Sequence, residues 1–148
     1  MMNIVFFCQE YKKNAEQFFS GTISDVDKQM FSKVVNELLR LHTLLCTKGL
    51  LGLVDESESK NVSELVLGKE LWRMLDMVCC GMEPEIFEEI CFMRYVTAGY
   101  CGKKGMLYLL YFAICLDIQA QVSAMVIEKR IKALLPDGVK IKTEMITT

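Results

Sequence analysis

The chain has 148 residues, a length typical of a single domain with one hydrophobic core. Hydrophobic residues make up 52% of it and charged residues 24%, with only 2 Pro and 9 Gly, which excludes a disordered or linker-rich protein. The formal net charge of -2 provides no broad positive surface, so we expect no nucleic-acid partner.

The first part of the chain predicts two helices. Residues 9–19 place aromatic and apolar side chains on one face of a short helix. Ser24 and Asp27 then form an N-cap signal, which opens a second helix over about 25–54. Gly49 lies late in that helix, where it weakens the helix and permits a kink or a close approach of another helix.

Two further helices are predicted in the middle of the chain. A second capping signal, Asn61 with Glu64, predicts a third helix that ends at Gly81. Pro84 suits the first turn of a fourth helix over about 84–98. This fourth helix carries one apolar side, formed by Ile86, Ile90, Met93 and Val96.

The most hydrophobic stretch is the run of eleven apolar residues from Met106 to Leu116. A helix of this length covers about half of the ~30 Å hydrocarbon layer, so we expect no membrane span but a largely buried central helix over about 105–118. Residues 118–135 continue as an amphipathic segment. The prediction is therefore an all-α fold, a compact bundle of five or six helices forming one domain over 1–138, with a C-terminal tail over 139–148.

Candidate reactive residues are few. Seven irregularly spaced cysteines indicate free, buried thiols in a reducing compartment, so a cytoplasmic location is expected. Cys79 and Cys80 are adjacent and lack the spacing that converges two sulfurs on a metal, and His42 is the only histidine. We expect His42 to be a hydrogen-bonded core residue, and we predict no metal site and no cofactor. An enzyme would need a pocket that joins His42 to a cysteine.

Three motif blocks stand in a characteristic order. Residues 118–136 read IQAQVSAMVIEKRIKALLP, residues 48–53 read KGLLGL, and residues 68–85 hold GKEL followed by GMEPE. In their order along the chain, 48–53, then 68–85, then 118–136, these blocks resemble the cytoplasmic region of the flagellar stator protein MotA and its relatives. The two membrane helices of that family need ~20 apolar residues each, which this chain does not supply between the blocks.

The resemblance implies a stator-like cytoplasmic domain that meets a protein partner. The charges with which the family contacts the rotor would fall near Cys46 and Val54, which are uncharged, but charged residues lie one or two positions away. A second charged patch lies at the start of the fourth helix, where carboxylates also compensate the helix dipole. The candidate partner-binding residues are Lys48, Asp55, Glu56, Glu83, Glu85, Glu88 and Glu89.

The sequence therefore leads to two hypotheses. The first is a non-enzymatic, motility-related domain that binds another protein. The alternative is a helical domain that self-associates as a homo-oligomer or binds an apolar ligand, because 10 Met and a positive mean hydropathy of +0.26 indicate excess apolar surface.

Overall fold

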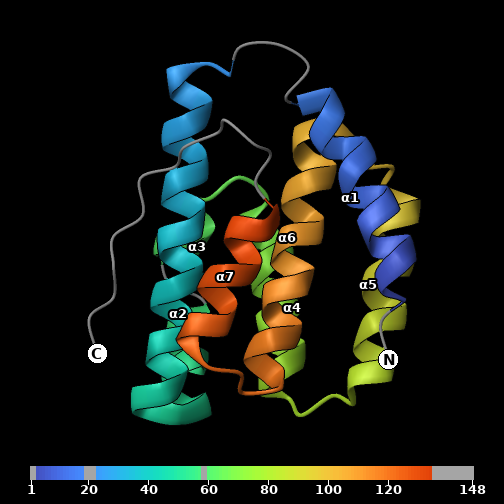
Figure 1. The fold of residues 1–148 in the computed structure, drawn as a ribbon. Coiled ribbons are helices and arrows are strands. Elements are labelled where there is room, and N and C mark those ends of the chain that lie inside the picture. The colour runs from blue at the N-terminus through green and yellow to red at the C-terminus, as the bar shows by residue number, and fades with distance from the viewer. Residues whose placement is uncertain (1–2, 19–22, 58–59, 135–148) are drawn as a thin grey trace.

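The computed structural model describes residues 3–18, 23–57 and 60–134 (Figure 1). All secondary structure in these ranges is helical, which confirms the all-α prediction. Six helices have eleven residues or more, and α3 adds a single turn to the predicted five or six. The elements are α1 (Ile4–Phe18), α2 (Asp25–Ser57), α3 (Lys60–Ser63), α4 (Gly68–Cys79), α5 (Pro84–Ala98), α6 (Gly102–Gln119) and α7 (Ala124–Leu134).

Helix α6 is the predicted central helix. Every residue from Gly105 to Cys115 is buried, and α1, α2, α4, α5 and α7 all pack against it (Figure 1). The hydroxyls of Tyr108 and Tyr111 reach carbonyl oxygens of neighbouring elements, at 2.7 Å and 2.6 Å, so their burial leaves no unpaired donor. One core cluster takes side chains from all seven helices. The predicted boundary between domain and tail, at 138/139, lies outside the described residues.

Two local predictions concern helix starts and interruptions. The Ser24 hydroxyl accepts the Asp27 amide at 3.1 Å, which confirms the N-cap of α2. Gly49 has φ 69° and ψ -165°, a backbone conformation that breaks the helical path and confirms a kink.

The predicted third helix, from Asn61 to Gly81, is wrong as a single helix, because the chain breaks between α3 and α4. Leu67 adopts a left-handed conformation with φ 57° directly before α4. Gly68 follows, at a position where a Cβ atom would overlap the carbonyl group of Val62. Val62 in α3 and Leu65 in the turn that follows it are both buried, so the interruption before α4 lies against the core.

The cysteines are less buried than expected. All seven are free, but only Cys91 and Cys115 are buried, and Cys79 is half-buried. Cys8 and Cys46 are exposed on α1 and α2, and Cys80 and Cys101 are exposed at helix ends, at the C-cap of α4 and the N-cap of α6.

Two helical hairpins, α4–α5 and α6–α7, share one turn geometry at positions 40 residues apart. In the first turn, backbone amides donate from Cys80 to Asp76, from Gly81 to Val78 and from Met82 to Met77, at 2.9, 3.1 and 3.2 Å. In the second turn, the same three bonds have the same lengths and join Ala120 to Leu116, Gln121 to Ile118 and Val122 to Asp117.

A side chain from another helix contacts the last carbonyl oxygen of each turn. The amide nitrogen of Gln119 in α6 donates to the carbonyl oxygen of Met82, and His42 in α2 contacts the carbonyl oxygen of Val122. The core positions also correspond, since Phe87 and Ile127 are both fully buried. The two hairpins therefore form a structural repeat, although their amino-acid sequences show no evident similarity.

Gln121→Gly is expected to raise the free energy of unfolding by about 0.5–1 kcal/mol, because a left-handed conformation costs a residue with a side chain about 1–2 kcal/mol. Gln121 has φ 56°, while the equivalent Gly81 has φ 75°. Urea unfolding would measure the difference. The reciprocal variant, Gly81→Gln, should lose stability, and a loss from both substitutions would contradict the equivalence of the two turns.

Candidate functional site

Helix α5 is apolar on two opposite sides. Its core side carries Phe87, Cys91 and Tyr95, all of them buried. Its outward side carries Ile86, Met93 and Val96, which are 45%, 64% and 68% exposed, and Ile90 beside them is 39% exposed. The apolar stripe predicted from the sequence therefore exists, but it faces outward rather than toward the core. Exposed apolar side chains that gather on one face of a helix are typical of contact sites, so the outward side of α5 is a candidate contact surface.

An acidic recess lies on one side of this stripe, between α5 and the first turns of α1. It has a volume of about 600 Å³ and is open to solvent. Phe6 and Phe92 meet edge-on, with ring centroids 5.4 Å apart, and Phe92 rests in turn on Phe112 at 4.9 Å. The residues that line the recess are Asn3, Phe6, Glu85, Glu88, Glu89 and Phe92. Three of the predicted partner-binding glutamates thus gather around aromatic side chains.

A smaller groove of about 320 Å³ lies on the other side of α5, facing α4. Its rim carries Arg73, Asp76 and Arg94, and its floor is apolar, formed by Met77, Ile90, Cys91 and Tyr108.

The buried carboxylate of Glu70 connects α4 to the end of α5 and to Tyr100 beyond it, next to this groove. Its Oε1 atom accepts hydrogen bonds from Arg73 at 3.0 Å, from Arg94 at 2.9 and 3.1 Å, and from the Tyr100 hydroxyl at 3.0 Å. The hydrogen bond and the charge of Glu70 raise the pKa of Arg94, which therefore stays protonated. Since Glu70 and Asp76 balance the two arginines, the groove has no excess of positive charge.

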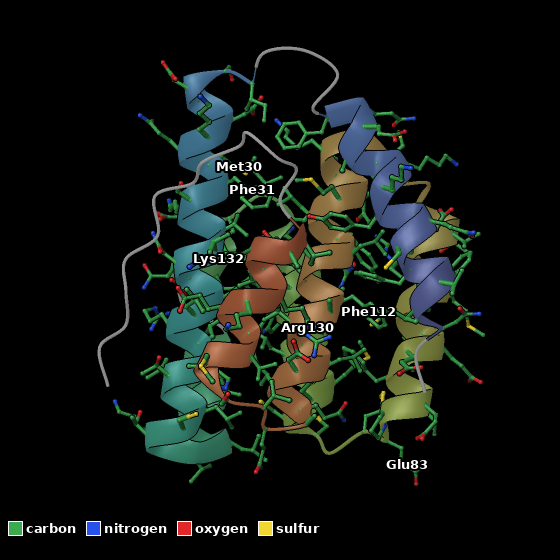
Figure 2. All side chains as sticks on the ribbon, viewed as in Figure 1. Met30, Phe31, Glu83, Phe112, Arg130 and Lys132 are labelled. Atoms are coloured by element: carbon green, nitrogen blue, oxygen red, sulfur yellow. The ribbon has the colours of Figure 1, made fainter. Side chains whose placement is uncertain are left out.

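The other predicted site residues lie elsewhere. Glu83 is exposed directly before α5 (Figure 2), outside the recess. Lys48 is exposed on α2 next to the kink at Gly49. Asp55 and Glu56 belong to the last turns of α2, and their side chains are outside the described part of the structure. The end of α2 and the start of α5 lie on opposite sides of the bundle (Figure 1), so the two predicted patches do not form one site.

His42 is a hydrogen-bonded core residue, as predicted. It is 1% exposed, and its Nε2 atom lies 2.6 Å from the carbonyl oxygen of Val122. Because a carbonyl oxygen only accepts hydrogen bonds, Nε2 is the donor and carries the proton. The Sγ atom of Cys46, one turn further along α2, lies 3.7 Å from the same nitrogen. Within the described ranges, no cluster of three or more His, Cys, Asp or Glu residues could hold a metal ion.

Arg130 of α7, labelled in Figure 2, forms an ion pair with Asp117 of α6, with 2.7 Å between Nε and Oδ2. Asp117 is 7% exposed. Burial raises the pKa of the Asp117 carboxyl, although the charges of Arg130 and His42 act in the opposite direction.

Asp117→Asn should remove part of the pH dependence of stability. The folded-state pKa of Asp117 lies above the unfolded value of 3.8, so its stabilising contribution is complete below that value and is lost as the pH rises through the folded pKa. Asparagine does not ionise, so the variant should gain stability relative to the wild type as the pH rises through that window and keep the gain at neutral pH. Urea unfolding at a series of pH values would measure it. Arg130→Ala should enlarge the effect, whereas parallel curves for wild type and variant would refute it.

None of the described helices combines the length and the apolar character needed to cross a bilayer. No protein-family model, curated protein or solved structure matches this chain. The candidate site therefore rests on its own residues: the outward stripe of α5, the acidic recess beside α1 and the groove beside α4.

Proposed function

We propose that the chain is a protein-binding helical domain and that the outward surface of α5, with the recess and the groove beside it, is its binding surface. The single observation that carries the proposal is the exposure of Ile86, Met93 and Val96 on a helix that also has a complete buried apolar face. Excess apolar surface rimmed by charged residues is typical of protein contact sites.

The residues around α5 favour binding over catalysis. The recess is lined by three carboxylates, one amide and two phenylalanines, and it contains no histidine, cysteine, serine, lysine or arginine that could assist a carboxylate in catalysis. The groove contains the Cys91 thiol, but burial raises the pKa of Cys91 to about 12, so the reactive thiolate is scarce at neutral pH. His42 is buried away from α5, and its Nε2 atom is hydrogen-bonded to the carbonyl oxygen of Val122. We therefore propose a non-enzymatic role.

The motif order that resembles the cytoplasmic region of MotA supports a motility-related partner. In this proposal the partner is a component of the flagellar motor, and the end of α2, with Lys48, Asp55 and Glu56, provides a second contact. The alternative is self-association through the same apolar stripe of α5, which Met93 and Val96 would also favour because they are the most exposed members of the stripe.

The experiment is deletion of the gene in a motile host, combined with affinity capture by the tagged full chain. We expect altered swimming and recovery of a motor component. Met93→Glu should abolish the capture, because it places a charge in the centre of the apolar stripe. Val126→Glu is the matched control, since Val126 is 38% exposed at the position of α7 that corresponds to Ile86.

Three outcomes would each remove part of the proposal. Unchanged swimming with no motor component captured would end the motility link. Capture that survives Met93→Glu would show that α5 is not the binding surface. Sedimentation that gives a homo-oligomer for the wild type and a monomer for Met93→Glu would favour self-association.

A further inference from the structure

We infer that the occupant of the α5 surface is a basic amphipathic helix, which places an aliphatic stripe on Ile86, Ile90 and Met93 and arginine side chains beside the acidic recess. This inference rests on the proposed function and adds the chemical class of the partner.

The apolar stripe has the dimensions of a helix-binding ridge. Ile86, Ile90 and Met93 follow the spacing i, i+4, i+7, and at 1.5 Å per residue the three side chains extend over about 10 Å of the helix axis. A second helix presents anchors with the same spacing over the same length. Apolar surface of the neighbouring groove, which both Ile90 and Met77 line, extends the contact toward α4.

The charge around the stripe determines which sign of charge the partner should carry. Four glutamates lie in or directly before the N-terminal half of α5, and three of them line the recess. The positive charges on the opposite side are already bound, because Arg73 and Arg94 both donate to Glu70. The surface therefore attracts cations at the start of α5. Phe6 and Phe92 in the recess favour a guanidinium over an ammonium group, since arginine stacks well on aromatic rings.

The second hairpin shows that the fold does not require these residues. At the positions of α7 that correspond to Ile86, Glu89, Ile90 and Met93, the chain has Val126, Lys129, Arg130 and Ala133. The hairpin thus forms with smaller apolar and with basic side chains at these positions. The shared hairpin geometry therefore does not account for the larger aliphatic residues and the negative charge on α5, which leaves them available for a contact outside the hairpin.

Binding of two synthetic peptides to the full chain would test the inference. Both form amphipathic helices with leucines at i, i+4 and i+7; one carries arginines at the flanking positions and the other carries glutamates. In fluorescence anisotropy titrations, the basic peptide should bind at least about tenfold more tightly than the acidic one, and added salt should reduce the difference.

Variants locate the contact. Met93→Glu should weaken binding of the basic peptide by about tenfold or more, as expected for a residue at the centre of an interface. Glu85→Lys with Glu89→Lys should reverse the preference between the two peptides. Val126→Glu should change neither affinity. Circular dichroism would verify that each variant is folded, and since all the substituted side chains are exposed, folding should be retained.

Several results would overturn the inference. They are equal affinity for both peptides, binding of the basic peptide that Met93→Glu leaves unchanged, and self-association that blocks the same surface. Failure of the basic peptide while affinity capture still recovers a partner that requires Met93 would overturn the partner class alone and leave the proposed function standing. Failure of capture as well would remove both.

Discussion

Phe112→Ala is expected to lower the free energy of unfolding by about 3–5 kcal/mol, the range for removing a buried phenylalanine from a packed core. Phe112 is 1% exposed in the centre of α6 (Figure 2). Its ring lies 5.8 Å from Phe87 and 4.9 Å from Phe92, both on α5, and 6.3 Å from Phe7 on α1. Three helices therefore share one aromatic cluster, and its loss leaves a cavity where they meet.

The same substitution should disturb the candidate site, because Phe92 both contacts Phe112 and lines the recess. Chemical denaturation would measure the stability. Hydrogen exchange should show faster exchange of amides in α1 and α5 than in α2 at the same denaturant concentration. Phe6→Ala is the control: Phe6 is 40% exposed, so its loss should cost only about 1–2 kcal/mol. A loss of similar size for both variants would contradict the central position of Phe112.

Helix α5 shows what the sequence determines and what it leaves open. Pro84 in the first turn and Gly99 at the C-cap fix the predicted bounds, and the structure has them at the same residues. The orientation of the helix was less determined, because both of its sides are apolar. Burial of the aromatic Phe87 and Tyr95 outweighs burial of Ile86 and Met93, a choice that depends on the shape of the space beside α6 rather than on periodicity.

The recess could be predicted only in part. Its glutamates form a visible cluster in the sequence, but Asn3 and Phe6 come from the other end of the chain and meet α5 only after both helices pack on α6. The break before α4 is not evident from the sequence either, because a single glycine such as Gly68 inside an apolar helical pattern does not by itself end a helix, and a left-handed conformation is not expected for Leu67.

Gly105→Ala is expected to lower the free energy of unfolding by about 3 kcal/mol, near the upper end of the cost of overpacking a core. Gly105 lies in α6 where α1 approaches closely. A Cβ atom at this position would come within 2.6 Å of the Cγ atom of Asn14, which is 2% exposed. Asn14 cannot move aside without cost, since its Nδ2 atom donates to the Tyr95 hydroxyl at 2.7 Å and to the Glu10 carbonyl at 2.9 Å.

A double-mutant cycle separates steric overlap from a general effect of alanine. Asn14→Ala removes the carboxamide and its hydrogen bonds, so it should itself cost about 1–3 kcal/mol. In that background Gly105→Ala no longer meets the carboxamide and should become stabilising by up to about 1 kcal/mol, because alanine is the better helix former. Such a change of sign requires direct contact between the two sites. If Gly105→Ala were equally destabilising with and without Asn14, the close packing of α1 on α6 would not explain the glycine.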